Sequence, residues 1–207
     1  MNLPNKLSIL RIILVPLMVF FYLASFITGG KIIALVIFII AALTDMLDGQ
    51  IARRCNLVTD LGKLIDPIAD KLLVLGAILL VIVDGTIPSP YGVIAALIII
   101  GRDFIVSALR QVAASKNVVL AADKWGKIKA IVLDITLPLL MLLSYFSIDL
   151  NMYGGATDTI RLVCYVLLGI GTLLTVYSGI NYMVKNAYVF KQENNNNKEE
   201  DNINQDV

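Results

Sequence analysis

Six long apolar stretches constrain this chain more than any other feature of its sequence. A helix needs about 20 mostly apolar residues to cross a bilayer. Stretches of that kind occupy residues 7–28, 31–52, 60–83, 91–113, 126–147 and 159–184. Hydrophobic residues make up 58% of the 207 residues and charged residues only 16%, which is typical of a membrane protein. We therefore predict an all-α integral membrane protein with six transmembrane helices.

The breaks between the apolar stretches are short, and no internal repeat is visible. No polar segment is long enough to build a separate core, so we expect one polytopic membrane domain over residues 1–189. Residues 190–207 are polar and rich in Asn, which predicts a disordered cytosolic tail. The first apolar run contains Arg11 and no cleavage site follows it, so we expect it to be retained.

The N-terminal residues leave two interpretations open. Pro4 suits the start of a helix, and Leu3, Leu7 and Leu10 lie on one helical face. This pattern predicts a short interfacial helix before the first spanning helix. The alternative is that these residues are the cytosolic end of the first spanning helix itself.

Lys and Arg predict the orientation, because they are enriched in cytosolic loops. With the N-terminus in the cytosol, most of the basic residues lie at or near the cytosolic side. These are Lys6, Arg11, Arg53, Arg54, Lys63, Lys71, Arg110, Lys116, Lys124, Lys127, Lys129 and Lys185. Only Lys31 and Arg161 lie at the outer ends. We expect a multi-pass protein of the cell (plasma) membrane with both termini in the cytosol.

Several classes of site find no support in the composition. The formal net charge is +1, and we expect no nucleic-acid partner. The two cysteines, Cys55 and Cys164, lie in unrelated segments and predict neither a disulfide framework nor a zinc site. The chain has no histidine, so a general base must be a carboxylate, a lysine or a tyrosine.

Aspartates interrupt the apolar pattern at one point. Asp45 and Asp48 lie three residues apart near the end of the second predicted helix, and Asp66 and Asp70 lie four apart near the start of the third. Each pair shares a helical face, and a short turn allows the pairs to converge. Four carboxylates at headgroup depth repel unless they are protonated or paired. Divalent cations such as Mg²⁺ or Mn²⁺ prefer oxygen ligands, and two such ions form a clamp for phosphate chemistry.

Small residues and an arginine accompany these aspartates. Gly49 lets a ligand approach the backbone, Ala52 is small, and Gly62 opens the second half of the site. The guanidinium of Arg53 can bind phosphate with two parallel hydrogen bonds.

Simpler interpretations exist for the single residues. Asp66 followed by Pro67 is also the pattern of a helix N-cap, and Asp60 can cap in the same way. Arg53 and Arg54 can be positive-inside anchors. The combination at fixed spacing favours a functional site.

The stretch matches D-x-x-D-G-x-x-A-R-x8-G-x-x-x-D-x-x-x-D at every specified position, and this is the signature of the CDP-alcohol phosphotransferase family. The matching residues are Asp45, Asp48, Gly49, Ala52, Arg53, Gly62, Asp66 and Asp70. Nearly the whole chain resembles the phosphatidylglycerophosphate synthase branch of that family. The similar stretches include "NLPNKLSILRI", "LTDMLDG", "LIDPIADKLL", "GRDFIVSALR" and "WGKIKA".

The resemblance implies six transmembrane helices, often in a homodimer, with a cytosolic active site and two divalent ions, Mg²⁺ or Mn²⁺. It implies that Asp45, Asp48, Asp66 and Asp70 are metal ligands and that Asp70 is also the general base. The first two aspartates and the residues between the pairs are then expected to bind CDP. These CDP-binding candidates are Asp45, Asp48, Gly49, Ala52, Arg53 and Gly62. The donor in this branch is CDP-diacylglycerol, the acceptor is sn-glycerol 3-phosphate, and the products are phosphatidylglycerophosphate and CMP.

Four basic residues are candidates for the phosphate of the acceptor. Arg102 lies about 17 Å into the fourth predicted helix, where a bare arginine is costly, and Arg110 lies nearly on the same face. Lys127 and Lys129 enter the next helix at the same level. Such a basic funnel suits a doubly charged phosphate. The alternatives are an internal ion pair of Arg102 with Asp103 or Asp134, and membrane anchoring by the two lysines.

Two departures from the branch fall on the acceptor side. Asp103 stands where the branch usually has Glu, and Ala130 stands where it usually has Thr. Other acceptors therefore stay open, namely phosphatidylglycerol, inositol phosphate and serine. An ion-coupled transporter is a remote alternative from another class.

Overall fold

The computed structural model of this chain describes the backbone of residues 3–54, 60–115, 118, 120, 123–150, 152 and 154–186. Side chains are described for residues 6–44, 62, 65–114, 118, 120, 123–150, 152 and 154–186. The predicted tail at 190–207 lies outside these ranges. The described residues are helical apart from short connections, and no strand occurs among them.

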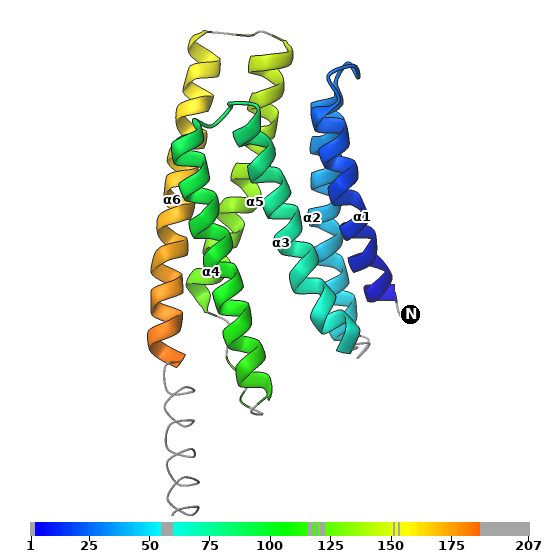
Figure 1. The fold of residues 1–207 in the computed structure, drawn as a ribbon, viewed down its shortest axis with the longest axis vertical. Coiled ribbons are helices and arrows are strands. Elements are labelled where there is room, and N and C mark those ends of the chain that lie inside the picture. The colour runs from blue at the N-terminus through cyan, green and yellow to red at the C-terminus, as the bar shows by residue number, and fades with distance from the viewer. Residues whose placement is uncertain are drawn as a thin grey trace, which may run out of the picture.

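Six long helices in the described ranges run along one common axis (Figure 1). In chain order they are α1 (Leu3–Leu23), α2 (Gly30–Arg54), α3 (Asp60–Val83), α4 (Ser89–Ser115), α5 (Lys124–Ser144) and α6 (Gly155–Asn186). A π-helical turn, Tyr145–Asp149, extends α5. Each of the six helices predicted from the sequence corresponds to one of these helices, so the prediction of an all-helical fold is confirmed for the described residues.

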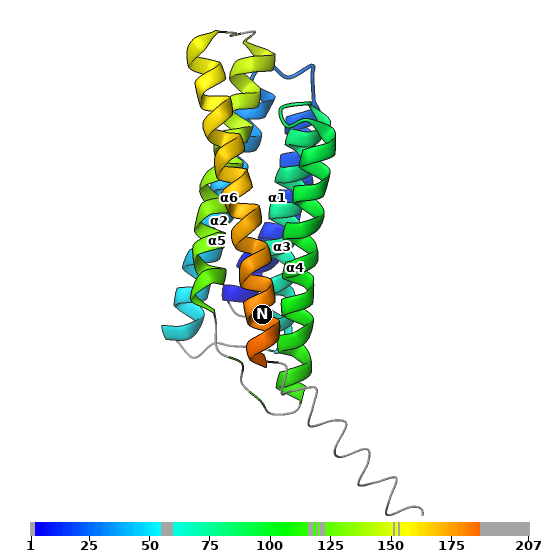
Figure 2. The same cartoon turned by 90° about the vertical axis from the view of Figure 1, so that its left-hand side faces the viewer.

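The two ends of the bundle differ. The connections after α1, α3 and α5 lie together at one end, which we call the turn end (Figures 1 and 2). We call the opposite end, where α1, α3 and α5 begin and α2, α4 and α6 end, the site end. The hairpin of α1 and α2 is tight because Gly30 has no side chain. A Cβ atom there would lie 2.4 Å from the carbonyl oxygen of Phe21.

The structure shows how α1 begins, for which the sequence left two interpretations open. α1 runs from Leu3 to Leu23 without a break, and proline is tolerated in a first helical turn, where Pro4 lies. Ser8 and Arg11 on this helix are fully buried against the bundle. The prediction of a separate interfacial helix is therefore wrong for the described residues, and these residues are the beginning of the first long helix.

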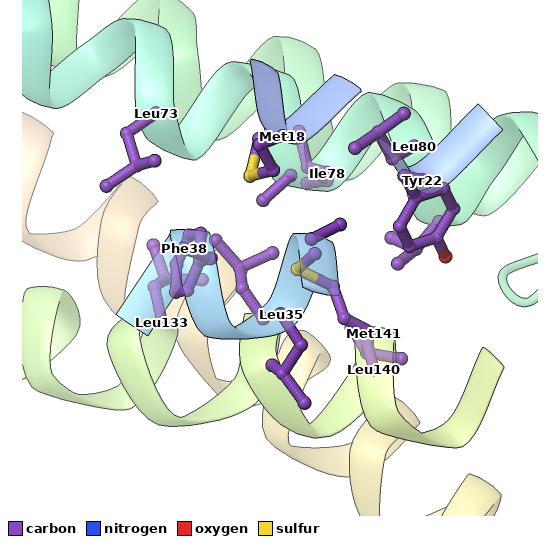
Figure 3. Close-up of a cluster of buried hydrophobic side chains, with 14 of the residues drawn as sticks. Met18, Tyr22, Leu35, Phe38, Leu73, Ile78, Leu80, Leu133, Leu140 and Met141 are labelled. Atoms are coloured by element: carbon purple, nitrogen blue, oxygen red, sulfur yellow. The ribbon is translucent and has the colours of Figure 1, made fainter. Parts of the chain in front are cut away.

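Apolar side chains from all six helices fill the centre of the bundle. α1 packs against α2 and α3, α2 also contacts α5, and α5 packs against α6. Met18, Phe38 and Ile78 are buried at the junction of the first three helices, and Leu133 and Met141 cover them from α5 (Figure 3). This core fixes α3 and α5 relative to each other.

Many large apolar side chains also lie on the outside of the bundle. Leu97, Leu162 and Leu173 expose 69%, 64% and 72% of their surface. Exposed apolar surface of this extent is costly in water and favourable in lipid. We conclude that the chain is a multi-pass membrane protein.

Length and composition support four spans within the described residues. These are Lys6–Leu23, Ser89–Ala114, Lys124–Asp149 and Gly155–Asn186. The apolar part of α2 is shorter, Gly30–Thr44. α3 carries Asp66, Asp70 and Lys71 in its first half, so its continuous apolar run is also short.

A polar cluster closes the turn end, and we call it the turn-end cluster: Tyr22, Lys31, Asp84, Ser144 and Asp149. The ammonium of Lys31 lies 3.0 Å from an Asp149 oxygen and 3.6 Å from an Asp84 oxygen. Tyr22 and Ser144 both donate hydrogen bonds to Asp84. The cluster therefore joins α1, α2, the end of α3 and the end of α5.

Candidate functional site

A cavity of about 650 Å³ opens at the site end between α3, α4 and α5. Five basic and four acidic side chains line it. They are Lys71, Arg102, Arg110, Lys127 and Lys129, with Asp70, Asp103, Asp123 and Asp134. This concentration of charge lies within a largely apolar bundle, so the cavity is suited to a charged, water-soluble ligand.

α3 positions two of the four motif aspartates. Asp66 and Asp70 are four residues apart, so they share a face of this helix. Asp70 is exposed and lines the cavity, and Asp66 is half-buried. The N-cap interpretation of Asp66 and Pro67 is wrong, because α3 begins at Asp60 and both residues lie inside it.

The other half of the motif belongs to the last turns of α2, which ends at Arg54. The side chains of Asp45, Asp48, Gly49, Ala52 and Arg53 lie outside the described residues. Gly62 is buried in the first turn of α3. Within the described side chains, no group of three or more His, Cys, Asp or Glu residues could bind a metal ion.

α1 contributes two buried polar side chains beside this motif. Ser8 donates a hydrogen bond to Asp66. Nε of Arg11 donates to the backbone carbonyl of Ala41 on α2, at 3.3 Å. Sequence reasoning did not assign either residue to the site. The sequence nevertheless contains an indication of their role. Ser8 and Arg11 are three residues apart and therefore lie on one face of an otherwise apolar helix.

Asp103 forms a pair with two of the four predicted acceptor residues. Nζ of Lys129 lies 2.6 and 2.7 Å from the two carboxylate oxygens of Asp103. One terminal nitrogen of Arg102 lies 3.1 Å from the same carboxylate. The alternative of an internal ion pair for Arg102 is therefore confirmed, and the charges of Arg102 and Lys129 are partly neutralised.

Glycines make room for Arg102 between α4, α5 and α6. Its other terminal nitrogen donates to Oγ of Ser178 on α6, at 2.5 Å. A Cβ atom at Gly179 would lie 2.9 Å from Cγ of Arg102, and one at Gly126 would lie 3.2 Å from the guanidinium. Ser178 in turn lies 3.4 Å from a carboxylate oxygen of Asp123. The arginine thus links three helices at the cavity wall.

Arg110 lies on the same cavity wall, about two turns further along α4 than Arg102. Its Nε donates to the hydroxyl of Tyr182 at 3.1 Å, and its guanidinium lies 5.4 Å from the centre of that ring. Tyr182 is buried, so it fixes the arginine from α6. Lys127 is exposed at the cavity, and Asp134 lines it from α5.

The last basic residue of the wall, Lys71, was not among the predicted site residues. Its Nζ lies 2.5 Å from Oγ of Ser107 and 5.3 Å from the centre of the Phe104 ring. The signal in the sequence was its position directly after Asp70. The cavity therefore brings together Asp70 with all four predicted acceptor residues and one further lysine.

Comparison with known proteins gives one family and a consistent set of relatives. Residues 1–180 match the family model described as CDP-alcohol phosphatidyltransferase. The chain is 36% identical to a protein of Bacillus subtilis (strain 168) over 204 residues, which cover 93% of this chain and 99% of that one. It is 34% identical to a protein of Rickettsia felis over 181 residues, covering 87% and 93%. It is also 34% identical to a protein of Haemophilus influenzae over 190 residues, covering 88% and 91%. All three are named CDP-diacylglycerol–glycerol-3-phosphate 3-phosphatidyltransferase.

Proposed function

This chain belongs to the CDP-alcohol phosphatidyltransferase family, and we propose that it transfers the phosphatidyl group of CDP-diacylglycerol to sn-glycerol 3-phosphate. The products are phosphatidylglycerophosphate and CMP, so the reaction belongs to phospholipid biosynthesis. The observation that supports this most strongly is that Asp70 and five basic side chains line one cavity. A carboxylate base beside a basic wall suits an acceptor that carries both a hydroxyl and a phosphate.

The reaction is a direct displacement at phosphorus. The primary hydroxyl of the acceptor attacks the phosphorus that bears the diacylglycerol, in line with the leaving CMP. The carboxylate of Asp70 accepts the hydroxyl proton as the new oxygen–phosphorus bond forms and the bond to CMP breaks. The exposure of Asp70 to the cavity supports this role, since a general base must reach the attacking hydroxyl.

Two divalent ions, Mg²⁺ or Mn²⁺, are part of the proposal. Bound ions would neutralise the pyrophosphate and the CMP leaving group. Asp45, Asp48, Asp66 and Asp70 are the proposed ligands, and an all-carboxylate set is the chemistry that these hard cations prefer. The described part of the chain fits this, because Asp66 and Asp70 share a face of α3 and Ser8 contacts Asp66 from α1.

The first half of the motif is proposed to bind the donor. Asp45, Asp48, Gly49, Ala52, Arg53 and Gly62 match the family signature and are the candidates for contact with CDP. Arg102, Arg110, Lys127 and Lys129 are proposed to attract the acceptor phosphate. For Arg102 and Lys129 the pairing with Asp103 reduces the charge that each can offer.

The membrane arrangement follows the same reasoning. We propose that all six helices cross the plasma membrane, with the site end and both termini in the cytosol, and that the protein forms a homodimer. The distribution of basic residues supports the orientation, because the cavity at the site end carries five of them, whereas Lys31 and Arg161 are the basic residues described at the turn end.

Release of CMP from CDP-diacylglycerol tests the function. The purified protein is incubated with Mg²⁺ or Mn²⁺ and one acceptor at a time: glycerol 3-phosphate, phosphatidylglycerol, inositol phosphate or serine. We expect CMP only with glycerol 3-phosphate. If CMP is released with only one of the other three acceptors, that compound becomes the proposed acceptor. If CMP is released with none of the four, the assignment as a transferase is overturned.

A further inference from the structure

Lys71 is positioned by α4 rather than by its own helix. Its ammonium donates to Oγ of Ser107 at 2.5 Å and lies 5.3 Å from the centre of the Phe104 ring. Ser107 and Phe104 are three residues apart on α4, so one face of that helix makes both contacts. An ammonium with both a hydroxyl and an aromatic partner has a defined position at the cavity wall.

Lys71 also differs from two other basic residues of the cavity in its partners. Arg102 and Lys129 both contact the carboxylate of Asp103. Within the side chains that the structure describes, Lys71 contacts a hydroxyl and a ring and forms no ion pair. A hydroxyl does not neutralise the charge of an ammonium, and the carboxylates of Asp103 and Asp70 act on Lys71 electrostatically without forming an ion pair with it, so its charge can still attract an anion that enters the cavity.

The neighbours of Lys71 complete a site for a phosphate. Ser107 accepts the hydrogen bond from Lys71, so its own O–H can donate to a phosphate oxygen. Arg110 lies three residues further along α4, on the same face. The Tyr182 hydroxyl contacts Nε of this guanidinium, which is one of its five N–H groups.

We propose that Lys71 and Ser107 bind the phosphate of the acceptor beside Arg110, and that Lys71 selects a phosphorylated acceptor over the free alcohol. This inference rests on the function proposed above. The ligand class is the dianionic phosphate monoester of a small polyol. Lys71 directly follows the proposed base Asp70 on α3, and although the two side chains point about 100° apart on the helix, both line the same cavity. A short polyol anchored by its phosphate at Lys71 therefore presents a hydroxyl to Asp70.

Steady-state kinetics of Lys71→Met tests the proposal. CMP release is measured against glycerol 3-phosphate at saturating CDP-diacylglycerol, and against CDP-diacylglycerol at saturating acceptor. We expect the KM for glycerol 3-phosphate to rise by about ten- to a hundredfold, the effect of losing a hydrogen bond to a charged group. The KM for CDP-diacylglycerol should stay within about twofold, and the preference for glycerol 3-phosphate over glycerol should fall. Lys185→Met, an exposed lysine in the last turn of α6, is the matched control and should leave both KM values unchanged.

The outcomes separate this inference from the proposed function. If the wild-type protein does not use glycerol 3-phosphate, the proposed function fails and the inference fails with it. If the wild type uses it and Lys71→Met leaves its KM unchanged, only the inference is overturned. If Lys71→Met aggregates in detergent, Ser107→Ala and Lys71→Arg decide. An unchanged KM for glycerol 3-phosphate in Ser107→Ala overturns the proposal. Lys71→Arg keeps the positive charge, so a KM for glycerol 3-phosphate that rises more in Ser107→Ala than in Lys71→Arg supports the proposal.

Discussion

The ammonium of Lys129 lies within 2.7 Å of both carboxylate oxygens of Asp103, although the two residues come from different helices of the cavity wall. Only 5% of the Lys129 side chain is exposed, so Asp103 is the main carboxylate that stabilises the charge of this lysine.

Replacing Asp103 by Asn should therefore destabilise the protein. We expect a loss of about 1–3 kcal/mol, the cost of a buried charged group without its partner. Asp103→Glu should keep most of the stability, because it retains the carboxylate. Thermal unfolding in detergent measures the change. In the double variant Asp103→Asn with Lys129→Met, part of the loss should be recovered; a fully additive loss would contradict the pairing.

Asp70→Asn should stop the chemical step. The amide cannot accept the acceptor proton, and removal of a general base typically lowers turnover by about a hundredfold to ten-thousandfold. CMP release at saturating substrates measures this, and the melting temperature should change little. Asp123→Asn is a control within the same cavity and should retain far more activity. Near-normal turnover of Asp70→Asn would remove the base assignment.

Ser8→Ala should weaken the response to the divalent ion. Ser8 donates to Asp66, which is one of the proposed metal ligands, and loss of a hydrogen bond to a metal ligand commonly reduces metal affinity by about ten- to a hundredfold. The concentration of Mg²⁺ for half-maximal activity should rise, and direct titration with Mn²⁺ by electron paramagnetic resonance should give weaker binding. Ser8→Thr keeps the hydroxyl and should behave like the wild type. Equal Mn²⁺ affinity in Ser8→Ala would exclude this role.

Gly179→Ala should disturb Arg102. The added methyl would lie 2.9 Å from Cγ of that arginine, close to its backbone, so the side chain has to shift. We expect a loss of about 1–3 kcal/mol, as for overpacked interiors, and a higher KM for the acceptor. Gly169→Ala lies on the same helix and meets nothing within 4 Å, so it should be neutral or stabilising. Thermal unfolding of both variants compares them directly, and identical effects would argue against a packed Arg102.

The sequence predicts the helices well because the length of an apolar run is a local property. α3 begins and ends where the apolar pattern does, at residues 60 and 83. The shared face of Asp66 and Asp70 also follows from their spacing alone. The start of α1 is different, since its burial depends on contacts of Ser8 and Arg11 with α3 and α2.

The contacts of the basic residues were harder to predict. Neighbours on a helix point about 100° apart, which favours distant partners for Arg102. In the structure the long arginine nevertheless reaches Asp103, which Lys129 also contacts from α5. Lys71 and Ser107 meet only because of the register of α3 against α4, and no spacing within one helix contains that information.

The turn-end cluster has a mechanical consequence. Four segments are tied at Asp84 and Lys31, while the other end of the bundle encloses a cavity of about 650 Å³. Helices that are tied together at one end of a bundle can separate most at the opposite end. We therefore expect any rearrangement of the helices around a bound ligand to be largest at the site end, where the cavity lies.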